Sequence, residues 1–532
     1  MEEQGYLLIV LHTHMPYIWN PVAAPTQEED WLYEALTECY IPLVDVFTRL
    51  IEFGADFRIS LSLTPCLADM LADPAMQLRY LEYLDARIAL AQAEIERLQD
   101  QPELLRLARM YRERFQRWRQ IYASDWDRNL LGAFRFLNDS GKVTILASAA
   151  THAYLPLWEA YPHWVAFQIQ LGVAQYEKTF GRPPHGFWLP ECAFYPGLDH
   201  YLHANGVKYF FLDAHGLLNG FPRPRYGVHA PVHTPAGVAA FGRDWQSHDL
   251  VWLKDKGYPG DPEYLDYERD LSSERPPEYL ATSMTGMQAA RTGILYRRNG
   301  FLGDNGVYHP DRAFERCDAH ANHFIAECQR QVTELHSRLG RKPLLVALFD
   351  TEHFGHWWRE GPLWLDLVIR KLAYDQNTVK LVTAQDYLRW YPTNQQVMPS
   401  MSSWGYQGYH ETWLMGRNHW IYPQLFAAAE LFDELVERTP NPSPQVRSAL
   451  NQYLREFVLA QSSDWAFIMH TQTAQAYAEQ RVHEHVANME ELYSQMNHGE
   501  INPGWLHSLQ EKHPIFAGVD LLELYLKSNH SP

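Results

Sequence analysis

The sequence is poor in cysteine and contains no long apolar run. Its five cysteines, in 532 residues, stand far apart without a CxxC pair, which argues against a disulfide framework or a cysteine zinc site and favours a reducing compartment. No apolar stretch reaches bilayer length, and the N-terminus lacks the basic region and the apolar segment of a signal peptide. We therefore expect a cytoplasmic protein without a membrane partner.

Basic residues are also in short supply. The sequence has 45 Lys and Arg residues against 64 Asp and Glu residues, and its formal net charge of -19 would repel nucleic acid and other polyanions. No glycine-rich nucleotide-binding motif occurs. Aromatic residues are abundant instead: 18 Trp and 31 Tyr predict compact folding and suit a neutral sugar, whose apolar ring faces stack on aromatic planes. The length predicts two or three domains and leaves the oligomeric state open.

One acidic residue follows a short apolar strand. Residues 186–189 read as a buried strand that Pro190 ends, and residues 198–205 read as the next helix. Glu191 therefore lies at the carboxyl end of a strand, which in a barrel of parallel strands is the face where catalytic side chains gather. The alternative is a structural Glu that a loop amide or an Arg satisfies.

A second acidic residue ends another buried strand. Residues 343–350 form an unbroken apolar run that closes on Asp350, as expected for a strand covered on both faces in a parallel sheet. Two such acids on separate strands of one barrel would face a common pocket. Paired carboxylates beside aromatic residues are typical of glycoside chemistry, in which one acts as nucleophile and the other as acid and then base.

Histidines follow two further strands. His12 and His14 come directly after the strand predicted at residues 5–11, and their spacing puts both side chains on the same side. His152 follows the strand at residues 143–147. Two functions remain open for the first pair: ligating a metal, as in metal-dependent amidohydrolases, or binding the hydroxyl groups of a substrate.

Strands and helices alternate along the first part of the chain, which favours an α/β barrel or a related closed sheet. Three domains are predicted. Residues 1–75 and 137–396 form the barrel, residues 76–136 form an inserted helical subdomain, and residues 397–532 form a C-terminal helical domain. The other strands of the barrel are predicted at 57–63, 209–213, 238–244 and 379–384.

Further candidate site residues lie in irregular or aromatic stretches. The segment 217–262 has the irregular pattern of a binding loop, and within it Arg243 either lines the pocket or forms a structural salt bridge. The stretch from Trp404 to Trp413 is too rich in Gly and aromatic residues for an ordinary helix start and suggests a sugar-stacking surface. Asp464 lies in a second polar and aromatic break, where the alternative is a helix cap.

Taken in order, these motifs resemble glycoside hydrolase family 57, and within it the 1,4-α-glucan branching enzymes. The resemblance implies an incomplete (β/α)7 barrel, a helical insertion, a C-terminal helical domain that completes the cleft, and a retaining mechanism without metal or other cofactor. It implies Glu191 as nucleophile and Asp350 as general acid/base. The glucan contacts that it implies are His12, His14, Trp31, His152, Trp404, Trp413 and Asp464. We add Arg243 to these contacts because of its place at a strand end.

The predicted reaction cleaves an α-1,4-glucan and transfers the chain to a 6-hydroxyl, forming an α-1,6 branch. If water attacks instead, the enzyme is an amylase. Family branching enzymes shield the site with a mobile loop often tipped by Tyr, and the candidate here is the region 219–237 with Tyr226. Two further classes of protein are compatible with the motifs: a metal-dependent hydrolase that uses the three histidines, and a non-catalytic glucan-binding protein.

Overall fold

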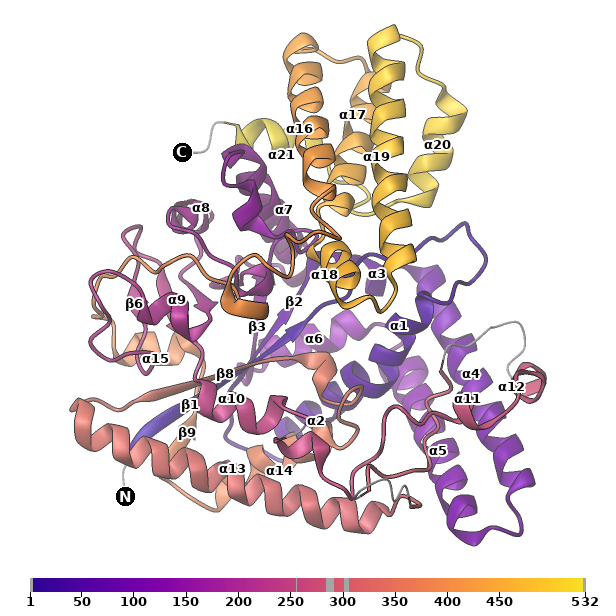
Figure 1. Cartoon of the computed structure of the whole chain (residues 1–532), viewed down its shortest axis with the longest axis vertical. Helices are drawn as coiled ribbons and strands as arrows, with labels where there is room; N and C mark the ends of the chain where they lie inside the picture. Colours follow the sequence, from indigo (N-terminus) through magenta and orange to yellow (C-terminus); the bar gives the residue numbers. More distant parts are fainter. Residues whose placement is uncertain (1–2, 255, 284–290, 301–305, 530–532) are drawn as a thin grey trace.

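The structure is a computed structural model that describes residues 3–254, 256–283, 291–300 and 306–529 (Figure 1). Within these residues, seven parallel strands curl around a common axis in the order β7-β5-β4-β3-β2-β1-β8, while β6 pairs antiparallel with β7, and β9 pairs with β1. A hydrogen bond of 2.8 Å from Asp244 N to Val346 O joins the end of β7 to β8. The predicted incomplete (β/α)7 barrel is confirmed. The strands are β1 Gly5–Thr13, β2 Ile59–Leu63, β3 Val143–Ser148, β4 Gly186–Trp188, β5 Tyr209–Leu212, β6 Val232–His233, β7 Ala239–Gly242, β8 Leu344–Asp350 and β9 Val379–Leu381.

Alternation along the strands decides which side chains reach the site. In β1 every residue is buried; its odd-numbered residues from Leu7 to Leu11 pack against the outer helices, and its even-numbered residues from Tyr6 to Val10 fill the barrel interior. The even-numbered apolar residues of β8 also point inward. His12 and Asp350 are the next even-numbered residues of these two strands, so they also point inward. They are register partners at the carboxyl ends of adjacent strands.

Helices cover the outside of the barrel, and α1 and α2 are joined by a π-helical turn at Leu36–Tyr40. None of the described helices is both long and apolar enough to cross a membrane. The helices around the barrel are α1 Glu29–Ala35, α2 Ile41–Glu52, α3 Pro65–Ala72, α6 Leu130–Asp139, α7 Pro162–Phe180, α8 Leu198–Ala204, α9 Ala214–Leu218, α10 Trp245–Trp252, α13 Pro310–Leu339, α14 Gly361–Tyr374 and α15 Ala384–Trp390.

Two long helices, α4 (Pro74–Arg97) and α5 (Pro102–Gln120), form a hairpin beside the barrel (Figure 1). Arg114 of α5 reaches the barrel, where its Nη2 lies 2.9 Å from Glu38 Oε2. A later segment with the short helices α11 (Leu271–Glu274) and α12 (Pro277–Ser283) packs on the same hairpin. The hairpin is therefore held by parts of the chain far from it in sequence.

The chain ends in a helical bundle, at the top of Figure 1. Its short helix α18 lies beside the barrel, because Ser462 forms a β-bridge with Ala153 just beyond β3. The bundle therefore brings residues near 463 to the barrel mouth, while the domain boundaries drawn from the sequence stay a prediction. The helices of the bundle are α16 Ile421–Arg438, α17 Pro444–Ala460, α18 Ser463–Thr471, α19 Gln475–His498, α20 Pro503–Lys512 and α21 Leu521–Ser528.

The loop predicted to cover the site lies at the other end of the barrel. The ring of Tyr226 is 5.3 Å from the guanidinium of Arg341, shortly before the start of β8, and His229 O accepts a hydrogen bond of 2.9 Å from Leu344 N, at the first residue of β8. The prediction of a lid at 219–237 with Tyr226 at its tip is therefore wrong. The segment follows helix α9 and leads to β7, so it belongs to the amino-terminal end of the strands.

Candidate active site

A cavity of about 560 Å³ opens at the carboxyl ends of the strands. Trp31 lies outside its lining: this side chain is on α1 and meets Tyr477 of α19 edge to face, with ring centroids 5.5 Å apart. The cavity brings together the other predicted site residues, which are His12, His14, His152, Glu191, Arg243, Asp350, Trp404, Trp413 and Asp464.

Glu191 is held by two distant segments. It lies in a single helical turn after β4 with φ 62° and ψ 21°, a left-handed conformation that non-glycine residues adopt rarely and that is common at functional sites. Its Oε2 accepts a hydrogen bond of 2.8 Å from the indole nitrogen of Trp404, and its Oε1 accepts one of 2.8 Å from Ser463 Oγ. Both carboxylate oxygens therefore have donors, which fixes their direction.

The two predicted catalytic carboxyls both have raised pKa values but differ in their neighbours. Burial raises the pKa of Glu191 to about 7, although the hydrogen bonds from Trp404 and Ser463 lower it. Burial, followed by the charges of Glu352 and Glu191, raises the pKa of Asp350 well above its usual range. Hydrogen-bond donors thus favour the ionised form of Glu191, whereas acidic neighbours favour the protonated form of Asp350. These surroundings suit a nucleophile beside a proton donor.

A third carboxyl, Glu352, was not predicted from the sequence. It lies two residues after Asp350 and lines the same cavity. Tyr40, the last residue of the π-helical turn, donates a hydrogen bond to its Oε1, as does His14 N at 3.3 Å. Burial raises the pKa of Glu352 to about 7. Its charge opposes ionisation of Asp350 and so helps to keep the proton on that acid.

A chain of hydrogen bonds leads through two histidines to Glu191. Ser62 Oγ lies 2.6 Å from His12 Nδ1, His12 Nε2 lies 2.9 Å from His152 Nε2, and His152 Nδ1 lies 2.9 Å from Ser463 Oγ. Because Ser463 donates its only hydroxyl hydrogen to Glu191, it accepts from His152, and this fixes both tautomers. Burial, then the charge on His14, lowers the pKa of His12 and of His152 well below the usual range. Both rings are neutral.

His14 is the charged histidine of the cluster. Burial alone would lower its pKa, but the carboxylate of Asp464, 2.8 Å from its Nε2, outweighs burial and raises the pKa of His14 well above its usual value. Ligand atoms of His14, His152 and Asp464 lie within 4.8 Å of one another, a set that suits a metal such as zinc. However, each nitrogen of His14 and of His152 already contacts a protein side chain. These contacts argue against a zinc site at this set, because no nitrogen of either histidine is left without a protein partner.

Aromatic side chains form the walls of the cavity. Trp413 is buried and stacks on Tyr154 with ring centroids 4.2 Å apart, and Trp188 stacks under His12 at 4.5 Å. Tyr406, which lies in the stretch predicted as a sugar-stacking surface, and Trp357, which was not predicted as a contact, also line the cavity and are exposed. Flat apolar walls beside convergent polar groups match the requirements of a sugar ring.

Arg243 satisfies both alternatives that the sequence left open. It lines the cavity, and it also forms a salt bridge, with Nη2 2.5 Å from Asp213 Oδ2. Its Nη1 lies 3.3 Å from His248 Nε2. The Asp213 carboxylate also accepts a hydrogen bond of 2.8 Å from the indole nitrogen of Trp245. The guanidinium is therefore fixed at the cavity wall.

Ser463 is a further residue that sequence reasoning missed. The only signal for it was its position next to Asp464, in a polar and aromatic break between helices. A serine that precedes a helix usually reads as a cap. Its contact with Glu191 joins residues 272 positions apart, and such a contact leaves no mark in the local pattern.

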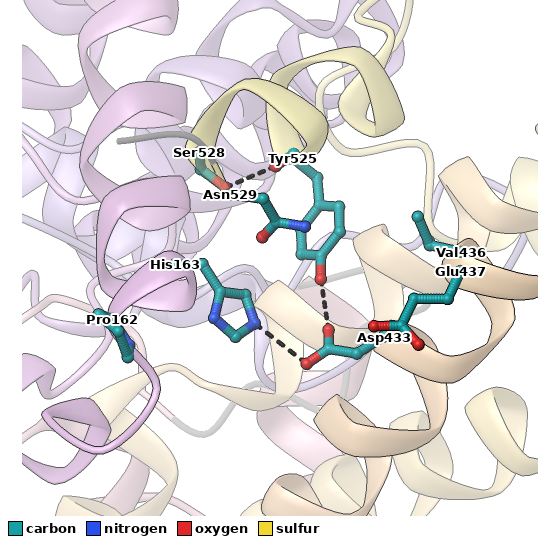
Figure 2. Close-up of a pocket in the computed structure, with 8 residues that line it drawn as sticks. All are labelled: Pro162, His163, Asp433, Val436, Glu437, Tyr525, Ser528 and Asn529. Atoms are coloured by element: carbon teal, nitrogen blue, oxygen red, sulfur yellow. Dashed lines mark hydrogen bonds and ion pairs between the residues drawn. The ribbon is translucent and has the colours of Figure 1, made fainter. Parts of the chain in front are cut away.

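Figure 2 shows a second hollow, between α7, α16 and α21, which none of the predicted site residues lines. His163 Nε2 lies 3.1 Å from Asp433 Oδ2, and Tyr525 donates a hydrogen bond to the other oxygen of the same carboxylate. These polar groups satisfy one another and join the bundle to the barrel. We assign no chemistry to this hollow.

A parallel (β/α)7 barrel whose mouth holds two half-buried carboxyls with raised pKa values between aromatic walls defines an enzyme that acts on glycosidic bonds. Comparison with known proteins gives the family. The model of glycosyl hydrolase family 57 matches residues 8–272, and the model of the 1,4-alpha-glucan branching enzyme C-terminal domain matches residues 424–523. The chain belongs to glycosyl hydrolase family 57.

Three similar proteins cover almost the whole chain. The 1,4-alpha-glucan branching enzyme of Thermococcus kodakarensis is 31% identical over 97% of this chain and 78% of its own length. The solved structure of the alpha-amylase AmyC from Thermotoga maritima has a TM-score of 0.90 and 38% identity, covering 98% of this chain and 99% of that one. The branching enzyme of this family from Pyrococcus horikoshii has a TM-score of 0.87 and 32% identity, covering 98% and 97%.

Proposed function

We propose that this chain is a 1,4-α-glucan branching enzyme that works by a retaining double displacement. One observation carries the proposal: the branching-enzyme C-terminal model matches the part of the chain that supplies Ser463 and Asp464 to the catalytic cavity. The similar proteins named as branching enzymes span nearly all of the chain, which supports the same conclusion. The substrate is an α-1,4-glucan such as amylose.

The first half of the reaction uses the different surroundings of the two carboxyls. Glu191, whose ionised form is stabilised by hydrogen bonds from Trp404 and Ser463, attacks the anomeric carbon, while protonated Asp350 gives its proton to the glycosidic oxygen. The bond between the anomeric carbon and that oxygen breaks, and a glycosyl ester on Glu191 forms. The reducing-end part of the glucan leaves with the proton.

The second half reverses the roles. Asp350, now ionised, takes the proton of a 6-hydroxyl group of another glucose unit, and that oxygen attacks the anomeric carbon as the ester bond to Glu191 breaks. The new linkage is α-1,6, with net retention of configuration. His14, which carries a positive charge beside Asp464, offsets the negative charge that Glu191 regains.

A retaining α-1,4-glucan hydrolase is the second candidate. The similar structure with 38% identity is named an alpha-amylase, and the loop expected to exclude water lies at the far end of the barrel. In that case water replaces the 6-hydroxyl in the second half of the reaction. The same two carboxyls serve either outcome.

The cellular setting is part of the proposal. We infer that the enzyme serves glycogen synthesis in the cytoplasm. All five cysteines are buried and unpaired, which supports a reducing compartment.

The test is to incubate the purified protein with amylose and to count new α-1,6 linkages and new reducing ends. Glu191→Ala is the inactive variant, and Glu490→Ala, on the exposed face of α19, is the matched control. A branching enzyme makes more branches than reducing ends, and Glu191→Ala loses both. Reducing ends alone would identify a hydrolase, and full activity in Glu191→Ala would refute the mechanism.

A further inference from the structure

A smaller hollow opens beside the catalytic cavity, and we call it the side pocket. It has a volume of about 230 Å³, and its lining includes Trp252, Lys254, Tyr267, Asn299, His353 and Trp357. Trp252 and Trp357 line the catalytic cavity as well. The side pocket therefore continues the cavity in which the two carboxyls lie.

Two exposed tryptophans form the shared wall. Trp357 is 48% exposed and Trp252 is 37% exposed, unusual values for large apolar side chains next to a deep cavity. Tyr267 supports Trp357 edge to face at 5.1 Å, and His353 stacks on Trp252 at 5.1 Å. His353 is itself fixed, because its Nε2 lies 2.8 Å from Val251 O. Trp252 also stacks on His248, with ring centroids 5.5 Å apart. Both indoles are therefore held in place by neighbouring rings, and Trp357 is the more exposed of the two.

Among the described residues that line the pocket, the polar groups are uncharged or paired. Asn299 Nδ2 donates to Pro259 O at 3.2 Å and to Asp261 O at 3.1 Å, which turns its side-chain oxygen away from these carbonyls and leaves that oxygen able to accept a hydrogen bond from a hydroxyl group. Lys254 Nζ pairs with Glu268 Oε1 at 2.9 Å. Aromatic faces with a single placed amide suit a neutral sugar ring better than a charged ligand.

The position of the side pocket indicates which of the two glucan chains it binds. His353 and Trp357 come from the segment that follows Asp350, whereas Trp404 and Ser463, which hold Glu191, do not line it. The glycosyl group bonded to Glu191 is the transferred chain. The oxygen that Asp350 protonates, and later deprotonates, belongs first to the leaving chain and then to the acceptor chain.

We propose that the side pocket binds the acceptor glucan, with a glucose ring stacked on Trp357 beside Trp252 and a hydroxyl group bound to Asn299. The proposal rests on the proposed function, because a branching enzyme must hold a second sugar chain and exclude water in its place. An occupied pocket favours attack by the 6-hydroxyl of the bound chain over attack by water.

The experiment separates formation of the glycosyl ester from its transfer. The donor is an α-maltotetraosyl fluoride, whose fluoride leaving group does not need the side pocket, and the added acceptor is maltoheptaose. We expect Trp357→Ala to raise the KM for the acceptor about tenfold and to lower first-turnover fluoride release by a clearly smaller factor. Trp357→Tyr, which keeps an aromatic face, retains most of the affinity.

Trp390→Ala is the matched control, because Trp390 is also exposed but lies against Tyr6, at the other end of the barrel. It should change neither quantity. An unchanged acceptor KM in Trp357→Ala would overturn the proposal, and so would an equal loss of fluoride release. If the wild-type enzyme forms no α-1,6 linkage, the branching function is refuted instead. The acceptor KM can then still be measured from transfer to any other sugar hydroxyl, so the pocket is tested separately.

Discussion

Trp404 and Glu191 are joined by two hydrogen bonds in the same direction. The main-chain nitrogen of Trp404 donates to Glu191 O at 3.0 Å, and its indole nitrogen donates to Glu191 Oε2 at 2.8 Å. One residue of the segment between barrel and bundle thus holds both the backbone and the carboxylate of the proposed nucleophile. The indole donor stabilises the ionised form of the carboxyl.

Trp404→Phe removes the indole donor and keeps an aromatic ring. Because the hydrogen bond lowers the pKa of Glu191, its loss raises that pKa, and less of the nucleophile is ionised at acid pH. We expect the acid limb of the kcat/KM profile to move up by about one pH unit. Trp413→Phe is the control, since the indole nitrogen of Trp413 has no hydrogen-bond partner among the described residues. A similar displacement in both variants would contradict the prediction.

Arg243 affects the other limb of the same profile. Its positive charge lowers the pKa of Asp350, although burial and the acidic neighbours raise that pKa overall. Arg243→Gln removes the charge, so Asp350 keeps its proton to higher pH, and the basic limb of kcat/KM moves upward. Arg243→Lys retains the charge and should leave the limb in place even where the rate falls. A basic limb that stays fixed in Arg243→Gln would show that Arg243 does not act on the acid.

Gly355 is predicted to tolerate no side chain. Its φ is 122°, and an added Cβ would lie 1.8 Å from the main-chain oxygen of Glu38, in the π-helical turn. We expect Gly355→Ala to destabilise the fold by roughly 3 kcal/mol or more and to lower Tm by several degrees. Gly416→Ala is the control, because nothing lies within 4 Å of the Cβ position there. Equal Tm values for the two variants would contradict the clash.

Glu456 lies fully buried in the helical bundle between two histidines. Its carboxylate is 2.7 Å from His485 Nδ1 and 2.8 Å from His513 Nδ1, and these neighbours hold the pKa of Glu456 far below its usual range against the effect of burial. Glu456→Ala leaves both imidazoles without an acceptor, and we expect a loss of about 3–5 kcal/mol, read as a lower Tm. Glu490→Ala should leave Tm unchanged, which separates this contact from a general effect of charge removal.

The contacts of Glu456 with the two histidines give a pH dependence of stability. Because the pKa of Glu456 is lower in the folded than in the unfolded chain, its stabilisation is complete above the unfolded value of about 4.3 and is lost as the pH falls toward the folded value. The difference in Tm between the wild type and Glu456→Ala should therefore shrink on acidification from pH 7 to below pH 4. A constant difference would assign the loss to packing alone.

Much of the barrel could be predicted, because the parallel strands β1, β5 and β8 carry unbroken apolar runs. The strands that end on His12 and Asp350 read directly from the sequence, and alternation along them places both side chains at the mouth. Glu191 could be found for the same reason. These predictions use patterns that span a few neighbouring residues, which a single sequence records well.

The lid could not be predicted by the same reasoning. Helix α9, at Ala214–Leu218, is too short to show a helical period, so the sequence after β5 reads as one long loop. Once α9 is recognised, the segment 219–237 connects a helix to a strand and lies at the opposite end of the barrel from Glu191. Loop length indicates that a loop has a function and does not indicate at which end of a barrel it lies.

The contacts of Glu191 determine at what stage of translation its active site can form. Its two side-chain donors, Trp404 and Ser463, follow it by 213 and 272 residues, so a ribosome makes them long after the nucleophile. A nascent chain whose barrel has folded already exposes both carboxyls, but it lacks the groups that orient Glu191 and favour its ionised form. Chains that end before the C-terminal bundle are therefore poor catalysts. The enzyme becomes competent to act on glucan only after the bundle has been translated.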